Sequence, residues 1–194
     1  MKSISSHITG LVFVACIFSL GYAQPKRVDK PEASRLKLTT PEGEINCTLD
    51  MSKEITTKVI DEIKSKHFDG SFICRAVMDY FVHMGCRKST MSNIEKKPLG
   101  FDLPRTGSHK KAGVLSVVKG AGDFGRLQLV IMLRPATWLD GTQTVIGQCR
   151  DLEFVRHLAR KPTVAGGKPR QPTQIITAEI LGPDLSKRRN GLAK

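Results

Sequence analysis

The sequence is poor in aromatic residues, and beyond its N-terminal segment it has no long apolar run. Phe, Trp and Tyr make up 6% of the 194 residues, and tryptophan occurs only at position 138. A membrane-spanning helix needs about 20 consecutive apolar residues, and no segment after residue 24 approaches that length. The sequence therefore predicts no membrane span in the part of the chain that follows the N-terminal segment.

Acidic residues are also scarce, with 18 Asp and Glu against 31 Lys and Arg, for a formal net charge of +13. A strongly basic chain can bind nucleic acid, so the distribution of the charge matters. Basic residues are scattered, and no aromatic residues alternate with them to stack on bases. The Lys and Arg residues occur in short groups along the chain, at residues 26–30, 95–97, 108–111, 160–172 and 186–194. We expect a solvated basic surface for acidic partners or an anionic membrane face, and no nucleic-acid partner.

The motifs of several enzyme classes are missing as well. The sequence has no nucleophile elbow, no P-loop, no paired metal-binding histidines and no zinc-type cysteine spacing. GAGDFG, residues 120–125, matches G-x-G-x-x-G, but the following RLQLVIML is a predicted strand, whereas a dinucleotide turn leads into a helix. We interpret GAGDFG as a loop, and we predict no metal and no cofactor.

The N-terminal residues have the pattern of a secretory leader. MKSISSH is short and basic, LVFVACIFSL is apolar, and the small residues of GYA precede Gln24. This pattern predicts a signal peptide at residues 1–23, a linker at 24–34, and a secreted or periplasmic protein. Lipid attachment at Cys16 is the disfavoured alternative, because the apolar run continues past it.

Four cysteines follow the leader, at positions 47, 74, 86 and 149. An even number in an exported chain permits disulfides, but several pairings are possible and the sequence does not choose among them. Buried free thiols are an equal alternative, because most of these cysteines lie in apolar runs. The state of the cysteines therefore stays open at this point.

Hydrophobic periodicity predicts a chain rich in strands with two helices. EITTKVIDEIKSKHF, residues 54–68, has apolar residues at helical spacing, and residues 152–159 repeat the pattern. Residues 160–172 form a predicted Pro/Gly loop, and the basic tail, residues 183–194, is expected to be disordered. Strands are predicted at residues 35–40, 45–50, 71–77, 79–84, 113–118, 126–133, 144–149 and 173–181. This pattern favours one domain, a β-barrel or sandwich whose open ends are covered by helices.

The order of three motifs resembles the cyclophilins. WLDGTQTVIG, residues 138–147, is similar to their W-L-D-G-x-x-x-V-F-G signature, and GVLSVV with RLQLVIM resembles G-x-L-S-M-A with S-Q-F-F-I. GSFICRAVMDYFVHMG, residues 70–85, resembles F-H-R-x-I and G-F-M-x-Q-G-G. The likeness covers residues 35–182. It implies a mainly β fold, an eight-stranded antiparallel β-barrel capped by two α-helices, with peptidyl-prolyl cis-trans isomerase activity on one outer face.

The resemblance gives Arg75 a catalytic role. A guanidinium keeps its proton, so an arginine in an apolar strand either reaches solvent or binds something. Rotation of an X-Pro bond breaks amide resonance, with a barrier of about 18–20 kcal/mol, and leaves a nitrogen lone pair that accepts a hydrogen bond. A fixed guanidinium beside that amide favours the twisted state. The alternative is a surface arginine paired with Asp79.

The resemblance also implies a set of substrate-binding residues. Phe81 and His83 alternate onto one strand face, which suits a pocket wall beside a polar contact. The alternative for Phe81, Val130 and Leu139 is ordinary barrel core. The implied substrate-binding residues are Tyr80, Phe81, His83, Gln128, Val130, Trp138, Leu139 and Gln143.

Departures from the family pattern fall in the same region. Cys74 replaces a histidine, Val130 replaces a phenylalanine, and Lys119 stands where the family has asparagine. Losing a phenylalanine wall removes on the order of 1–3 kcal/mol of contact with a proline ring. Two functions are therefore predicted for a monomeric protein with proline-containing polypeptide clients. The first is a secreted isomerase that assists the folding of exported proteins, and the alternative is a binding or chaperone module with little turnover.

Overall fold

A computed structural model describes residues 34–87, 100–119 and 126–182 of the chain. The predicted signal peptide, the linker except Ser34, the GAGDFG turn and the basic tail lie outside the described residues.

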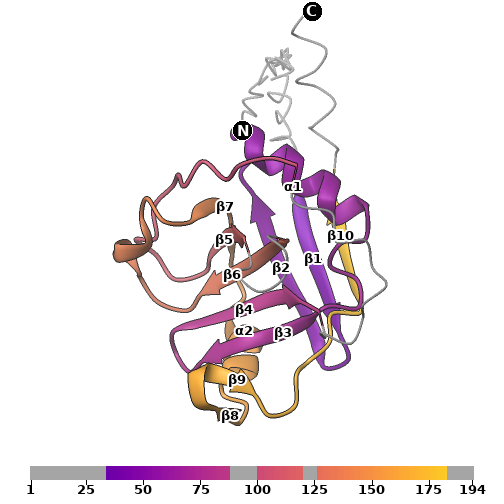
Figure 1. Ribbon diagram of the computed structural model, residues 1–194, viewed down its shortest axis with the longest axis vertical. Helices are drawn as coiled ribbons and strands as arrows, with labels where there is room; N and C mark the ends of the chain where they lie inside the picture. Colours follow the sequence, from indigo (N-terminus) through magenta and orange to yellow (C-terminus); the bar gives the residue numbers. More distant parts are fainter. Residues whose placement is uncertain (1–33, 88–99, 120–125, 183–194) are drawn as a thin grey trace, which may run out of the picture. The chain divides into compact units, whose positions relative to one another are not determined.

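The described residues form one antiparallel sheet of eight strands, in the order β10-β1-β2-β7-β5-β6-β4-β3 (Figure 1). Alternation of buried and exposed side chains in β1 and β2 matches a sheet with one face on the core. The strands are β1 (Arg35–Thr40), β2 (Gly43–Leu49), β3 (Phe72–Val77), β4 (Phe81–Cys86), β5 (Val114–Lys119), β6 (Leu127–Met132), β7 (Thr144–Cys149) and β10 (Thr177–Leu181).

The sheet curls so that segments beside its two edge strands meet. The Gly70 and Ile73 amides donate to the carbonyls of Ile175 and Thr173 at 2.8 and 2.9 Å. The Ile175 amide donates back to Ser71 O at 2.8 Å. Residues 173–176, predicted as the start of the last strand, instead make this junction. The predicted mainly β, eight-stranded antiparallel fold is confirmed.

Both predicted helices are present, as α1 (Glu54–Lys64) and α2 (Glu153–Ala159). Helix α1 buries Ile55, Val59, Ile60 and Ile63, the face that the sequence predicts. It ends before residue 68 because the chain turns at Lys66, which has a φ of 63°. Helix α1 contacts β10, and α2 contacts β2, β3 and β4, toward a different end of the sheet (Figure 1). No helix in the described part of the chain is long and apolar enough to cross a bilayer.

The predicted Pro/Gly loop contains a small hairpin that the sequence did not predict. Strands β8 (Thr163–Val164) and β9 (Lys168–Pro169) flank the turn η2 (Ala165–Gly167). Gly166 and Gly167 have φ values of 77° and 76°, a left-handed conformation that glycine adopts without steric cost. The two glycines let the chain reverse direction within this segment.

Two disulfides join neighbouring strands. Cys47 on β2 bonds to Cys149 on β7, and Cys74 on β3 bonds to Cys86 on β4. The alternative of buried free thiols is therefore wrong for the structure, and the pairing follows from which strands are adjacent. Cys47 and Cys149 lie in the main core with the strand residues Leu36, Leu38, Ile45, Val82, Met84, Leu115, Leu129 and Ile131.

Candidate functional site

A groove of about 260 Å³ opens where β3, β4, β5 and β6 meet the segment that follows β6. Most of the predicted site residues line it, but Gln128 and Trp138 do not. Val118 and Met132 also line the groove, but the sequence did not predict them. Alternation along the strand could have identified Met132, because it shares a strand face with Val130. The lining residues are Arg75, Tyr80, Phe81, His83, Val118, Val130, Met132, Leu139 and Gln143.

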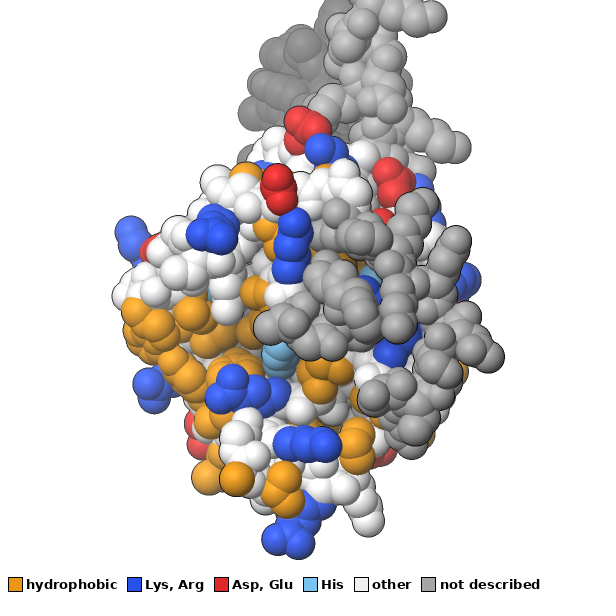
Figure 2. Space-filling view, in the orientation of Figure 1, with side chains coloured by type: hydrophobic (Ala, Val, Ile, Leu, Met, Phe, Trp, Pro, Cys, Tyr) orange, Lys and Arg blue, Asp and Glu red, His pale blue; other side chains and the backbone are white. Residues whose placement is uncertain are grey.

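The apolar floor of the groove is a small cluster, separate from the main core. On β6, Leu129 and Ile131 belong to the main core, whereas Val130 and Met132 belong to the floor. The alternation of a strand therefore places the floor on the opposite face of the sheet. Phe81 and Leu139 are partly buried, pack against this floor and line the groove, so they lie outside the main core. Figure 2 shows hydrophobic side chains gathered on the side of β5 and β6, with Lys and Arg beside them.

Arg75 extends from β3 at the border of the groove. Its Nε donates to Gly166 O at 2.8 Å, and its Cζ lies 5.4 Å from the centroid of the Phe81 ring. The hairpin after α2 comes this close because residue 167 is glycine. A Cβ at Gly167 would lie 3.3 Å from Arg75 Cγ and 2.9 Å from Ala76 O. Gly166 and Gly167 therefore orient Arg75, a role for which no pattern of neighbouring residues provides a signal.

The alternative pairing of Arg75 with Asp79 does not occur. Asp79 lies instead 3.6 Å from Arg156 and 4.0 Å from Arg160, both on or next to α2. Asp79 has a φ of 55°, so the turn between β3 and β4 directs it away from the strand face that carries Arg75. The guanidinium has no hydrogen bond other than that to Gly166 among the described residues.

His83 adds a polar group to the groove. Burial lowers the pKa of His83 below its ordinary 6.5, a hydrogen bond with Gln128 opposes that shift, and the charge of Arg75 lowers the pKa further. The imidazole is therefore neutral at pH 7. Its Nε2 and the Oε1 of Gln143 are both buried without a hydrogen-bond partner among the described residues. These two buried polar atoms beside the groove are therefore left without a partner by the described residues.

The two predicted residues outside the groove lie close to it. Gln128 is 4% exposed, and its Nε2 donates to Cys86 Sγ at 3.2 Å. Trp138 is 54% exposed and stacks on Tyr80, with 5.7 Å between ring centroids. Gln128 therefore lies behind the groove, whereas Trp138 supports Tyr80 from the solvent side.

A hydrogen-bonded chain, buried at Ser116 and His109 and exposed at Asp140, holds the turn that carries Leu139, η1 (Thr137–Leu139). Asp140 Oδ1 accepts from the His109 amide at 2.7 Å and lies 2.9 Å from its Nδ1, and His109 Nε2 lies 2.7 Å from Ser116 Oγ. The bond from the His109 amide is the main cause that lowers the pKa of Asp140.

His109 is fully buried, and the sequence did not single it out as a structural residue. Its partners lie 7 and 31 residues away, a distance at which residue spacing gives no signal.

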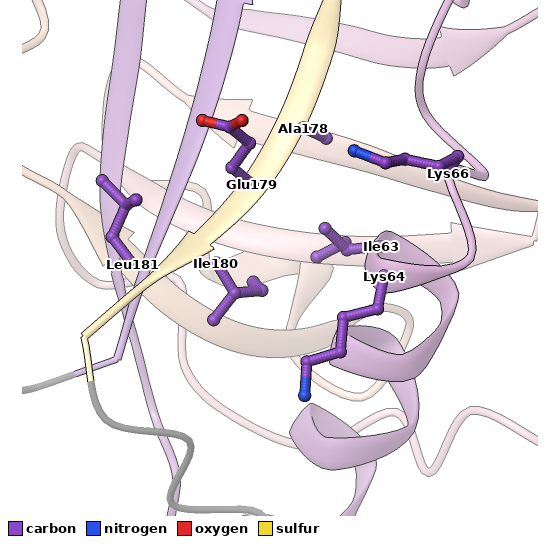
Figure 3. A pocket seen from close by; sticks show the side chains of 7 residues that line it. All are labelled: Ile63, Lys64, Lys66, Ala178, Glu179, Ile180 and Leu181. Atoms are coloured by element: carbon purple, nitrogen blue, oxygen red, sulfur yellow. The ribbon is translucent and has the colours of Figure 1, made fainter.

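A second groove, of about 380 Å³, lies between the end of α1 and the edge strand β10 (Figure 3). It contains no predicted site residue. Its polar groups are solvent-facing ends of side chains, which do not converge on one point (Figure 3). Its lining is Ile63, Lys64, Lys66, Ala178, Glu179, Ile180 and Leu181. We therefore place the candidate site in the groove that contains Arg75.

Comparison with solved structures shows the class of fold. The chain resembles a solved cyclophilin-type peptidyl-prolyl cis-trans isomerase from Cryptosporidium parvum, in a structure determined in the presence of the dipeptide Ala-Pro. The TM-score is 0.63 at 14% identity, over 77% of this chain and 99% of the other. The fold is therefore that of the cyclophilins.

Sequence comparison gives the family. The model for cyclophilin-type peptidyl-prolyl cis-trans isomerases matches residues 35–180. Peptidyl-prolyl cis-trans isomerase-like 1 of Neurospora crassa is 24% identical over 119 residues, which are 59% of this chain and 73% of the relative. Peptidyl-prolyl cis-trans isomerase ppi1 of Schizosaccharomyces pombe is 25% identical over 122 residues, 61% and 79% of the two chains. This chain belongs to the cyclophilin-type peptidyl-prolyl cis-trans isomerase family.

Proposed function

We propose that this protein is a peptidyl-prolyl cis-trans isomerase that acts on proline-containing polypeptides outside the cell or in the periplasm. The observation that carries the proposal is a fixed arginine beside an apolar floor on the outer face of the sheet. A proline ring would lie on Val130, Met132 and Leu139. The amide before it would then face Arg75.

Arg75 catalyses the rotation by an electrostatic effect. As the X-Pro bond twists, the proline nitrogen becomes pyramidal and its lone pair accepts a hydrogen bond from the guanidinium. The planar cis and trans states offer no such lone pair, so the interaction strengthens only in the transition state. Arg75 is preorganised for this task, because Gly166 and the Phe81 ring hold its side chain at the groove.

A neighbouring groove supports an extended polypeptide as the substrate. It measures about 250 Å³ and shares Val118 with the groove of Arg75. Lys119 and Asp102 form an ion pair of 2.8 Å at its border. A chain that places a proline on the apolar floor can continue into this second space, which would supply binding energy away from the reacting bond.

Export is supported by two independent features. The first residues have the pattern of a secretory leader. All four cysteines after it form disulfides, which persist in oxidising compartments. The clients we propose are therefore exported polypeptides that fold in the same compartment, with the protein acting as a monomer. N-terminal sequencing of protein from the native export route should find Gln24 first, and a chain starting at Met1 or at an acylated Cys16 would contradict export by this signal peptide.

The test is a cis-trans assay on a series of proline tetrapeptides. We expect Arg75→Ala to lower kcat/KM by about tenfold to a thousandfold, the scale for loss of one preorganised donor. Arg150→Ala removes an exposed arginine away from the groove and is the matched control. The melting temperature of both variants should stay near that of the wild type. An Arg75→Ala protein as active as the Arg150→Ala protein would remove Arg75 from the mechanism.

A second candidate function is a binding or chaperone module with little turnover. Val130 favours it, because this small side chain forms part of the floor where the family has phenylalanine. In that case the same tetrapeptides would bind, as measured by calorimetry, without faster isomerisation.

A further inference from the structure

The disulfide between Cys74 and Cys86 lies directly beside the groove, because its two strands also carry Arg75, Phe81 and His83. One ring nitrogen of His83 and the two sulfur atoms lie within 4.8 Å of one another. This cluster could not be recognised from the sequence, because the spacing of the three residues along the chain matches no zinc motif. The register of β3 against β4 brings the three residues together.

We propose that Cys74, His83 and Cys86 form a Zn²⁺ site when this disulfide is reduced. A dithiol reductant supplies two electrons and two protons, the S–S bond breaks, and the reductant leaves as its own disulfide. Zn²⁺ then displaces one proton from each thiol. Two thiolates and one neutral imidazole form a familiar zinc donor set with a fourth position open to water.

The geometry of the strands suits this site. Bonds of about 2.0–2.3 Å to zinc place tetrahedral donors about 3.3–3.8 Å apart. The cluster already lies within 4.8 Å, so rotation of the two cysteine side chains supplies the remaining adjustment. The Cα atoms of Cys74 and Cys86 are 5.8 Å apart. The pairing of β3 with β4 is irregular around Ile73 but regular from Arg75 to Val77, so we expect the two cysteines to stay close after reduction.

One of the proposed sulfur ligands already accepts a hydrogen bond from a neighbouring side chain. Gln128 Nε2 donates to Cys86 Sγ at 3.2 Å, and Gln128 is almost fully buried. A donor of this kind stabilises a thiolate more than a disulfide sulfur, because the thiolate carries a full charge. The position of Gln128 behind the groove thus has a role that the resemblance did not imply.

Metal binding would alter the groove through His83. A coordinated imidazole is fixed toward the metal, so it is no longer available to a polypeptide beside Arg75. Loading with zinc would therefore weaken isomerase activity in the reduced protein, whereas the oxidised protein would not respond. This consequence rests on the proposed function, but the metal site itself does not.

The test uses the full chain reduced by a phosphine without oxygen, with Co²⁺ as the probe and Zn²⁺ as its competitor. We expect the reduced wild type to bind one equivalent of Co²⁺ with a thiolate charge-transfer band, and the oxidised protein to bind none. Cys74→Ser/Cys86→Ser keeps the other cysteines and is the matched control, which should show no such band. His83→Gln should weaken Zn²⁺ binding about tenfold or more, at least as much as loss of an outer-shell partner.

A second measurement covers the case in which full reduction unfolds the chain. Cys47 and Cys149 are each 1% exposed, so mild reduction should open the more accessible Cys74–Cys86 bond first. Zn²⁺ should then protect Cys74 and Cys86 from alkylation, as mapped by mass spectrometry. The proposal is overturned if reduced wild type takes up no metal, if the double serine variant binds equally well, or if Zn²⁺ gives no protection. Because neither readout needs a peptide, an inactive isomerase would leave these outcomes unchanged.

Discussion

Arg75 and His83 are register partners across the antiparallel pair of β3 and β4, and both side chains line the same groove. The pairing places a permanent cation next to an imidazole that burial keeps neutral. A polypeptide bound here meets a donor that cannot lose its proton and a ring whose bonding depends on pH. The activity should therefore depend on pH through His83.

The first prediction concerns that dependence. The pKa of His83 lies below 6.5, so kcat/KM should stay level near pH 7 and fall as the pH drops through the lowered pKa. Protonation removes the acceptor of the ring and puts a second cation beside Arg75. His83→Gln should flatten the profile of kcat/KM between about pH 5 and 8. Parallel profiles for the two proteins would show that His83 takes no part in substrate binding.

The same pKa shift predicts the pH dependence of stability. In the unfolded chain His83 regains its ordinary pKa of 6.5, so below that pH the unfolded state binds more protons than the folded state. The free energy of unfolding should therefore decrease as the pH falls from 6.5 toward the lowered pKa. Denaturant melts at several pH values should show a smaller decrease for His83→Gln. His67, whose pKa burial also lowers, contributes equally to both proteins and cancels in the comparison.

The third prediction tests the glycine that lets the hairpin approach Arg75. Gly167→Ala strains a residue with a φ of 76° and pushes a Cβ against Ala76 O and Arg75 Cγ. We expect a loss of stability of about 1–2 kcal/mol from the left-handed backbone alone. We also expect kcat/KM to fall about tenfold because Arg75 moves. Gly166→Ala has the same strain with nothing within 4 Å of its Cβ, so its activity should change less. Equal losses of activity in both variants would contradict the positioning role of Gly167.

The fourth prediction concerns the hydrogen bonds of His109, which connect Asp140 beside η1 to Ser116. His109→Ala leaves the buried Ser116 hydroxyl without its partner and removes the imidazole from Asp140, which keeps its bond from the amide of residue 109. The free energy of unfolding should fall by about 1–3 kcal/mol. Leu139 should lose its fixed position, so KM should rise more than kcat falls. Calorimetry and the tetrapeptide assay measure the two effects. A variant with unchanged KM would show that η1 is held by other contacts.

Asp140 makes the stability of the η1 turn depend on pH through a carboxyl group. Its pKa lies below the ordinary 3.8, so its stabilising effect is complete above that value and is lost as the pH falls through the lowered pKa. Asp140→Asn cannot titrate and should remove this part of the acid transition. The comparison is made by denaturant melts between about pH 2 and 5, a range that brackets ordinary carboxyl groups.

The last prediction separates the two disulfides. Cys47 and Cys149 are 102 residues apart in sequence, and Cys74 and Cys86 are 12 apart. Because a longer loop loses more entropy on closure, Cys47→Ala/Cys149→Ala should cost about 4–5 kcal/mol and Cys74→Ala/Cys86→Ala about 3 kcal/mol. Urea denaturation of the two double variants measures the difference. The reverse order would mean that local packing outweighs loop length.

The sequence by itself determined the class of fold and most of the groove. Alternation and helical spacing gave the strands and the buried face of α1, because these periods depend on local geometry alone. The resemblance brought Arg75, Phe81, Val130 and Leu139 to one groove, and the sheet places them there. Their roles in binding and catalysis stay predictions.

The tertiary structure alone decided the partners of these residues. Arg75 bonds to Gly166, 91 residues away, and His109 bonds to Asp140, 31 residues away. The sequence left the cysteine pairs open, and they follow from the neighbours of β2 and β3 in the sheet. Such contacts depend on strand order, register and the path of a hairpin. These are set by packing of the whole chain, and no local pattern of residues encodes them.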